Sequence, residues 1–432
     1  MGVKTCTPIA MFLTVLYGSS VVAKEVNSAI PPFSLEVEKS KIQFESDVYL
    51  AEQHLEAYEN AIQELEESDD ADDAITDLEY GKKYYQEING LPMFSLLGGP
   101  AYTPEQGVLA AIGGLYSFKT DRNQQDLQRS SVSAFIISNY VDSEVGYGLR
   151  AKHNLFWDNN DIQFKGEWNA GLQSKHYWGV GYDAAETVSQ GDDTRYTAVS
   201  NNYKGDLSMR LHDEWFLGAL LKLNYFNVTD EPLSGLGDEN YALYSDTTFT
   251  WGLGARLKYD SRDVAVNAWS GSLFSTELLA YETALGSQLT YQKLDVDYRT
   301  YHSVDEGKVI ALLANYKQAF GDVPYFDMPE LGGATSMRGL YQGQYRDKTT
   351  AELTVEYRHT FSRNSGTLSA HGVTLWGGLG AIGSDISDLQ GHSVTSYGVG
   401  YRYELQPRMN IRLDLGMSKH GAAFYFNFTE AF

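Results

Sequence analysis

The fold is decided by the stretch Met409-Asn410-Ile411-Arg412-Leu413-Asp414-Leu415-Gly416-Met417, which alternates without a break. Its odd-numbered residues are all apolar, and its even-numbered residues are all polar or small. A repeat of two residues is the period of a β-strand, and about ten residues cross a membrane as a tilted strand. The stretch therefore predicts a strand with one face towards lipid and the other towards water.

Outward from this stretch, the same alternation recurs over residues 91–432, which we predict to be one β-barrel domain. The predicted strands are 93–102, 107–118, 130–140, 144–156, 161–173, 196–211, 214–228, 247–260, 271–283, 287–300, 307–320, 349–361, 369–381, 394–404, 409–418 and 421–430. All of them exceed the five or six residues that are usual in soluble sheets. Closed single-chain bacterial barrels have an even number of antiparallel strands, so we predict an all-β transmembrane barrel of about 16 strands embedded in outer-membrane lipid.

The first 23 residues predict a signal peptide. Lys4 is followed by the apolar run Pro8–Tyr17, and Val21-Val22-Ala23 offers a cleavage site after Ala23. The apolar run is too short to cross a bilayer as a helix. Export together with a barrel predicts the outer membrane of a Gram-negative bacterium. The only cysteine, Cys6, lies inside this signal, so we expect no disulfide and no thiolate metal site in the mature chain.

Residues 24–90 predict a helical segment in the periplasm. Apolar residues recur there in alternating steps of four and three, at Phe44, Val48, Ala51, Leu55, Tyr58, Ile62 and Leu65. Such a seam suits either a coiled coil or a two-helix hairpin, and a second helix is predicted over 72–88. We therefore expect a periplasmic protein partner, or self-association through the helix at 33–66.

The composition argues against several classes of function. The formal net charge of -24 argues against nucleic-acid binding, which requires clustered Lys and Arg. The sequence contains no H-E-x-x-H, no G-x-S-x-G and no phosphate-binding glycine loop followed by a helix. We predict that the chain is not an enzyme and holds no cofactor and no metal.

Four motifs together resemble one family. Met337-Arg338-Gly339-Leu340 lies in the longest connection between predicted strands, and Asp260, Arg262 and Asp263 form a turn after the strand at 247–260. Residues 101–107 read as a first hairpin, and the last strand carries Phe424, Phe426 and Phe428, with Phe432 behind them. In this order the motifs resemble the R-G tip of the sixth loop, the D-x-R-D periplasmic turn, the first hairpin and the C-terminal assembly signal of the BamA/TamA superfamily. This superfamily comprises the bacterial surface-antigen barrels that assemble and translocate proteins.

The sequence departs from the family in two places. The family's protein-handling members generally carry periplasmic POTRA domains, whereas the residues before this barrel read as helix, so we predict a POTRA-less branch with an N-terminal helical segment. Where the family commonly has F-x-D-x-G, this chain reads Trp376-Gly377-Gly378-Leu379-Gly380. Gly378 thus replaces the carboxylate that usually pairs with the loop arginine.

These departures leave the partner of Arg338 open. A lumenal guanidinium favours a carboxylate, and Glu352, Glu356 and Asp414 lie on the polar parity of their predicted strands. We predict pairing with Glu352 or Glu356 and keep Asp414 as a further candidate; the alternative is a solvated arginine. Asp260, Arg262 and Asp263 are expected either to tie their turn together or to remain solvated.

The resemblance implies membrane protein assembly: a barrel that handles or inserts envelope proteins or lipids through the seam between its first and last strands. The alternative from the residues themselves is a plugged channel or structural barrel whose helices tether it to periplasmic partners.

Overall fold

The computed structural model describes residues 44–432 except 67–71, 142–143, 188–193, 231, 233–234, 236–237, 364–367 and 407. The predicted signal peptide at 1–23 and the start of the helical segment lie outside the described residues. Two compact units are distinguished. The first joins the residues up to Gly99 with Gly114–Ser133 and His153–Ile162, and the second holds the remainder.

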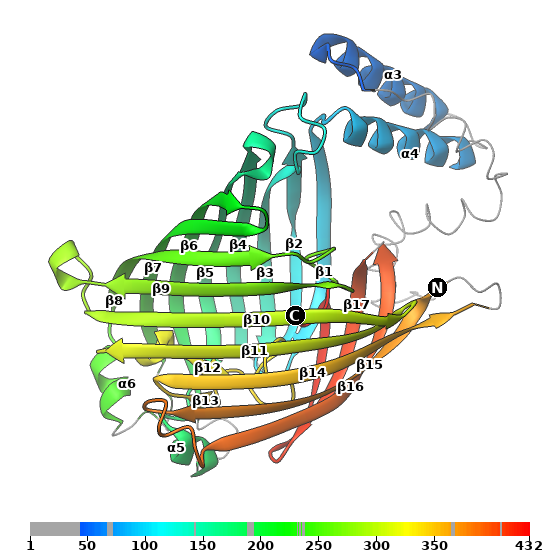
Figure 1. Ribbon diagram of the computed structural model, residues 1–432. Helices are drawn as coiled ribbons and strands as arrows, with labels where there is room; N and C mark the ends of the chain where they lie inside the picture. Colours follow the sequence, from blue (N-terminus) through cyan, green and yellow to red (C-terminus); the bar gives the residue numbers. More distant parts are fainter. Residues whose placement is uncertain are drawn as a thin grey trace, which may run out of the picture. The chain divides into compact units, whose positions relative to one another are not determined.

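Sixteen long antiparallel strands form a closed barrel (Figure 1). They are β1 Met93–Thr103, β2 Gly107–Phe118, β3 Ser130–Val141, β4 Glu144–Trp157, β5 Ile162–His176, β6 Arg195–His212, β7 Trp215–Asp230, β8 Thr248–Asp260, β9 Gly271–Tyr281, β10 Tyr291–Asp305, β11 Lys308–Gly321, β14 Thr349–Ser362, β15 Leu368–Gly383, β16 Ser393–Gln406, β17 Met409–Ser418 and β18 Gly421–Phe428. Each strand pairs with its neighbour along the chain, β11 pairs with β14, and β18 closes on β1 with Tyr102 opposite Phe426. The predicted fold class and all sixteen predicted strands are confirmed.

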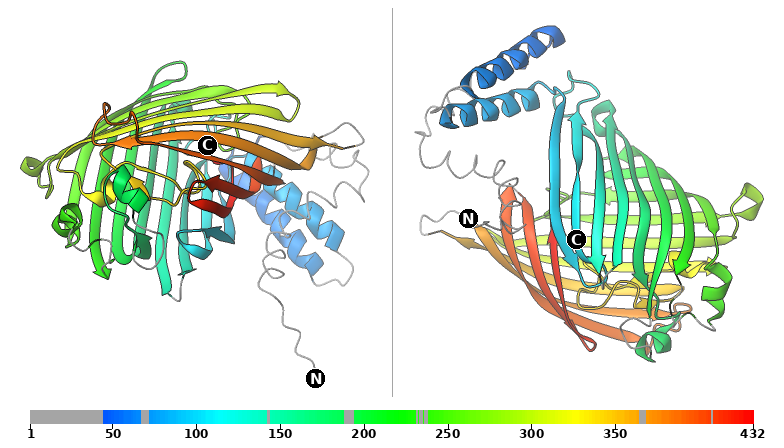
Figure 2. Two further views of the ribbon diagram at one scale, coloured as in Figure 1. Left: turned by 90° about the horizontal axis from the view of Figure 1, so that it is seen from below. Right: turned by 180° about the vertical axis from the view of Figure 1, so that it is seen from behind.

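The alternation of β17 has the predicted orientation. Asp414 and Arg412 point inward and are buried, whereas Leu415 on the other parity is 39% exposed. The inward residues are buried because the connection at 322–348 lies inside the ring of strands (Figure 2). This connection carries two short strands that the sequence did not predict, β12 Glu330–Leu331 and β13 Tyr345–Arg346. The connection at 322–348 therefore fills the barrel interior next to β17.

The strand connections define two ends of the barrel. At the loop end lie the connections 177–194, with helix α5 Tyr182–Thr187, and 231–247, with helix α6 Glu239–Tyr244, together with 322–348. At the turn end lie the connections 119–129, 213–214, 261–270 and 306–307. Long connections therefore gather at one end.

Helices α3 Val48–Glu66 and α4 Asp72–Ile88 lie side by side as a hairpin (Figure 1). Ala51 and Tyr85 are buried between them, and Leu55 and Tyr58 pack against the same cluster. The middle of the heptad seam is thus covered by α4 of the same chain. Of the two structures that the pattern allowed, the structure shows the hairpin, and self-association through this seam would require the hairpin to open. None of the described helices is long and apolar enough to cross a membrane.

Two arginines of the 119–129 connection hold the end of this hairpin. The Arg129 guanidinium donates to the main-chain oxygens of Leu91 at 2.6 Å and Ser117 at 3.1 Å. Arg122 donates to the main-chain oxygens of Asn89 at 2.6 Å and Glu45 at 3.0 Å. Carbonyls at a helix C-terminus are unpaired and carry partial negative charge, so these cations fix the exit of α4 to the connection.

Candidate functional site

The connection at 322–348 turns its R-G tip towards the inner face of β17. Leu331, Met337, Leu340 and Tyr345 form an apolar cluster that seats the connection against the barrel wall. Gly339 has a φ of +114°, and a Cβ on it would lie 2.7 Å from the Met417 nitrogen. A side chain here would clash with β17, so glycine is required for the close approach.

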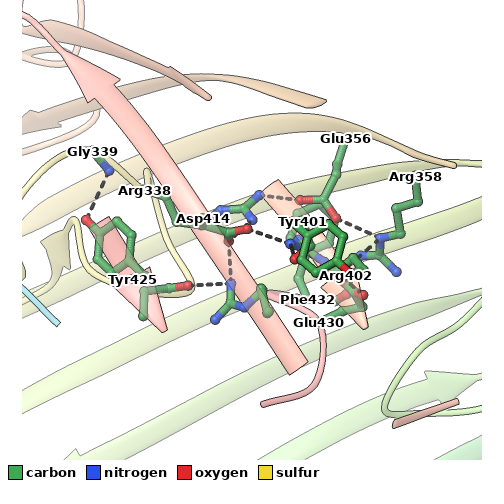
Figure 3. A network of polar contacts seen from close by, with 12 residues as sticks. Arg338, Gly339, Glu356, Arg358, Tyr401, Arg402, Asp414, Tyr425, Glu430 and Phe432 are labelled. Atoms are coloured by element: carbon green, nitrogen blue, oxygen red, sulfur yellow. Dashed lines mark hydrogen bonds and ion pairs between the residues drawn. The ribbon is translucent and has the colours of Figure 1, made fainter. Parts of the chain in front are cut away.

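Arg338 is 2% exposed and lies between two carboxylates (Figure 3). Its Nη1 is 2.7 Å from Asp414 Oδ2 on β17, and its Nη2 donates to Glu356 Oε2 on β14. The guanidinium carbon also lies 3.7 Å from the centre of the Trp376 ring. One arginine thereby joins the loop to three strands through two ion pairs and a cation–π contact.

Further arginines continue this network along the wall. Asp414 Oδ1 accepts from Arg402 Nη1 at 2.6 Å, and Asp414 Oδ2 lies 3.1 Å from Arg412 Nη1. Glu356 Oε1 accepts from Arg358 Nε at 2.7 Å. Arg402 Nε in turn donates to both oxygens of Glu430, at 2.9 and 3.1 Å. We call these seven residues the arginine network; its members are Arg338, Glu356, Arg358, Arg402, Arg412, Asp414 and Glu430.

Glu352, the other predicted partner of Arg338, makes different contacts. It accepts hydrogen bonds from Ser336 Oγ at 2.5 Å and from the Met337 main-chain nitrogen at 3.1 Å. It therefore holds the main chain just before the tip, while Glu356 and Asp414 hold the guanidinium.

The structure explains why residue 378 is a glycine and not a carboxylate residue. A Cβ at this position would lie 2.8 Å from Thr354 Oγ1 and 3.0 Å from Met337 Sδ. Met337 occupies the space that a carboxylate on β15 would need. The carboxylates that hold Arg338 lie on β14 and β17 instead.

Asp327 is a second anchor that the sequence analysis missed. This buried carboxylate lies 2.6 Å from Lys222 Nζ and 2.7 Å from Lys293 Nζ, and it accepts a hydrogen bond from the Tyr291 hydroxyl at 2.9 Å. Burial alone would raise the pKa of Asp327, but the two ammonium groups hold it well below its ordinary value. Two lysines at inward positions of different strands were the available signal, because such charges require a counter-charge.

The tip also bridges the two sides of the barrel seam. On β18, the Tyr425 hydroxyl accepts from the Gly339 nitrogen at 3.1 Å and donates to the Leu340 oxygen at 3.2 Å. In the β1–β2 turn, Glu105 accepts from the Gln342 nitrogen at 2.8 Å. We call this arrangement of 339–342 the seam clasp. Burial raises the pKa of the Glu105 carboxyl, and the hydrogen bond from Gln342 opposes that shift.

The model of the Omp85 superfamily domain matches residues 115–432. The chain belongs to the Omp85 superfamily. As a barrel of this superfamily it is a protein of the bacterial outer membrane. No curated protein matches its sequence.

Two solved structures show the same barrel fold as this Omp85 chain. One is BamA from Haemophilus ducreyi lacking POTRA domains 1–3, with a TM-score of 0.51 and 11% identity, over 78% of this chain and 69% of that one. The other is CdiB from Escherichia coli, with a TM-score of 0.52 and 11% identity, over 78% of this chain and 62% of that one. The chain thus spans less than two thirds of the CdiB chain.

The D-x-R-D turn of this Omp85 chain is tied together by its own side chains. Arg262 forms a two-pronged contact with Asp260, at 2.8 and 3.0 Å. Asp263 accepts from the main-chain nitrogens of Val264 and Trp269 and pairs with Arg408 Nη2 at 2.7 Å. Arg408 lies between β16 and β17, so it links two connections at the turn end, a role that the sequence analysis missed.

The predicted assembly signal divides into two parts. Phe424 is exposed on the outer face of β18, and Phe426 and Phe428 share its parity. Phe432 was grouped with them, but it is buried among inner residues of β10 and β11. Phe432 leaves the outer face because β18 ends at Phe428 rather than 430 and Thr429 adopts a φ of +63° that turns the chain inward.

Among the residues that the structure describes, no group of three or more His, Cys, Asp or Glu side chains is arranged to hold a metal ion. The arrangement at the site offers ion pairs, hydrogen bonds and a strand seam.

Proposed function

We propose that this Omp85 chain handles polypeptides at its seam, assembling envelope proteins in the outer membrane or passing them across it, without enzymatic chemistry. The observation that carries the proposal is the construction of the seam. With eight residues, β18 is the shortest of the sixteen wall strands, and the seam clasp holds its two sides together.

A short, glycine-flanked seam is suited to opening. Gly98, Gly99, Gly113 and Gly114 lie in β1 and β2, and glycine weakens strand pairing. Separated strands would present unpaired N–H and C=O groups, which bind an added strand. The membership of the Omp85 superfamily and the similarity of the fold to BamA and CdiB support this proposal.

We further propose that the turn end and the α3–α4 hairpin face the periplasm. In this orientation the long connections lie outside, as outer-membrane barrels generally have them. The hairpin would then be a contact surface for a periplasmic protein partner.

Locking the seam tests this function. A chain carrying Tyr102→Cys and Phe426→Cys joins β1 to β18 at a position where their residues are opposite. We expect oxidation to remove the function in cells, seen as lower levels of outer-membrane proteins and greater sensitivity to vancomycin, with recovery under reduction. The control is Tyr401→Cys with Leu413→Cys, which joins opposed residues of β16 and β17 away from the seam. Unchanged protein levels after complete cross-linking of the seam would rule out seam opening.

The second candidate is a plugged channel or structural barrel, favoured by the packed connection at 322–348 inside the wall. A plugged barrel predicts low conductance in planar bilayers, and Asp327→Ala with Arg338→Met should raise it by releasing both anchors. This candidate also predicts that the cross-linked seam retains full activity, so the two experiments separate the functions.

A further inference from the structure

Residues 429–432, which follow β18, are held by side chains of other strands. From Thr429 onward the chain leaves the β-ladder and enters the lumen, with Glu430, Ala431 and Phe432 all buried. Figure 3 shows Glu430 and Phe432 beside Arg358 and Arg402. None of the groups that receive these side chains belongs to β18.

We call the residues that hold this segment the cradle: Arg358, Arg402, Asn410 and the apolar cluster around Phe432. One part of the cradle binds the charged carboxylate of Glu430. The Glu430 carboxylate receives both hydrogen bonds from Arg402 Nε, a third at 2.7 Å from Asn410 Nδ2, and lies 3.9 Å from Arg358 Nε. Arg358 Nη2 also donates to the Phe432 main-chain oxygen at 2.8 Å. Charge-assisted hydrogen bonds of this kind are stronger than neutral ones and specify a carboxylate.

The other part recognises an aromatic ring. Phe432 packs in an apolar cluster whose other members come from β10, β11 and the β8–β9 turn: Ala268, Tyr301, Val309, Ala311 and Leu313. The Arg358 guanidinium carbon also lies 5.5 Å from the centre of the Phe432 ring. The cradle thus reads an acidic side chain and, two residues later, an aromatic one.

The arginines that hold Glu430 each have a second carboxylate partner outside the segment. Arg358 pairs with Glu356, and Arg402 pairs with Asp414, so neither depends on Glu430 alone for its position. Without Glu430, the arginine network has four guanidiniums and only two carboxylates in a buried setting. Buried charge without a counter-ion is unfavourable, so an empty cradle attracts an anion, and its apolar wall attracts a ring.

We propose that this cradle is a peptide-binding site for segments with an acidic residue followed two positions later by an aromatic one. The resting chain fills the site with its own Glu430 and Phe432. The inference names a client class for the proposed function and in that respect rests on it: when β18 leaves the seam, the segment leaves with it and a client segment of the same chemistry takes its place.

The test supplies the segment separately. The purified chain lacking residues 429–432, in detergent micelles, is titrated by calorimetry with an acetylated peptide of residues 427–432. We expect saturable binding to this shortened chain and none to the intact chain, whose cradle is filled. Peptides with E430Q or F432A should bind at least about tenfold more weakly, because each loses one of the two recognised groups.

Matched variants of the shortened chain locate the site. Arg402→Gln should weaken peptide binding at least about tenfold, whereas Arg150→Gln, a lumenal arginine of β4 paired with Glu167, should leave it unchanged. If the shortened chain fails the heat-modifiability test for a folded barrel, the intact chain with E430Q and F432A replaces it. Absence of binding to whichever chain is folded, or equal binding of the E430Q peptide, overturns the proposal. Peptide binding requires neither seam opening nor assembly activity, so a failed cross-linking experiment leaves this result standing.

Discussion

At the scale of single residues, the charges of the arginine network decide what each substitution does. Four guanidiniums face three carboxylates, so removing Arg338 leaves equal numbers of each. Glu356 keeps Arg358, and Asp414 keeps Arg402. Arg338 therefore positions the tip, but its positive charge is not needed to balance the carboxylates of the arginine network.

We predict that Arg338→Met leaves the barrel folded, at a cost of about 1–2 kcal/mol, and makes the tip accessible to chymotrypsin at Tyr341. Glu356→Gln should cost more, on the order of 3 kcal/mol, because it leaves Arg338 and Arg358 short of a carboxylate. Urea unfolding in micelles, followed by tryptophan fluorescence, compares the two. A larger loss from Arg338→Met than from Glu356→Gln would contradict this reading of the charges.

The sequence could predict only part of this site. Alternation identifies Glu356 and Asp414 as inward residues, and the resemblance singles out Arg338, so these three could be named in advance. Arg358, Arg402 and Arg412 share the inward parity of their strands, but alternation does not tell how far around the wall a loop reaches. That depends on the path of the 322–348 connection, which is set by packing of Met337 against Gly378 and Gly380.

At the scale of elements, the seam clasp makes β18 depend on the β1–β2 turn. We predict that Glu105→Ala speeds amide hydrogen exchange in residues 421–428 several-fold, because the Gln342 nitrogen loses its acceptor and the seam clasp then contacts the seam only on its β18 side. Glu105→Gln should have a smaller effect, since its amide oxygen can still accept. Glu306→Ala, in the exposed β10–β11 turn, is the control, and equal exchange in all variants would show that the clasp does not restrain the seam.

The helical hairpin depends on Arg129, a cation that does not belong to the arginine network. Arg129→Gln removes charge-assisted bonds to the main-chain oxygens of Leu91, at the exit of α4, and of Ser117 in β2, each worth about 1.5–3 kcal/mol. We predict faster hydrogen exchange in residues 72–88 while the barrel strands exchange as before. Arg210→Gln, which replaces a half-buried arginine near the end of β6, should change neither region. Unchanged exchange in α4 would mean that the apolar cluster around Tyr85 suffices to hold the hairpin.

The elements themselves were largely readable from the sequence because alternation is a local property of each strand. The exceptions are elements fixed by distant contacts. β12 and β13 are two residues each, too short for a repeat to show, and form because Glu330 and Arg346 meet inside the barrel at 3.0 Å. β18 stops at Phe428 because Arg402 and Arg358 draw the following residues into the lumen. The heptad pattern indicated a buried seam on α3 but could not tell whether α4 or another chain covers it.

At the scale of the whole barrel, three distant connections meet at the loop end around Glu186 of α5. The Lys419 ammonium, from the β17–β18 turn, lies 2.6 Å from its carboxylate, and the Tyr345 hydroxyl of β13 donates to it. His420 Nε2 is 2.5 Å from the same hydroxyl and 3.7 Å from the carboxylate. These contacts couple the start of β18 to connections from two other parts of the wall.

This cluster should loosen in acid. Burial lowers the pKa of His420, and although burial opposes it, hydrogen bonds from Lys419 and Tyr345 lower the pKa of Glu186. A group with a depressed pKa in the folded state stabilises that state above its unfolded pKa and loses this contribution as the pH falls. The cluster around Glu186 should therefore weaken in two steps as the pH falls. The first, below about pH 6.5, comes from protonation of His420, and the second, below about pH 4.3, comes from protonation of Glu186.

Spin labels at Asp183→Cys and Ala422→Cys, in a Cys6→Ser chain, measure the distance between α5 and the start of β18. We predict that the distance distribution broadens as the pH falls from 7.5 to 5, and again below 4.3. His420→Gln should abolish the first step and leave the second, because Gln does not titrate, while His212→Gln, at the turn end, should alter neither. A first step that survives His420→Gln would assign the acid response to another group and release β18 from this cluster.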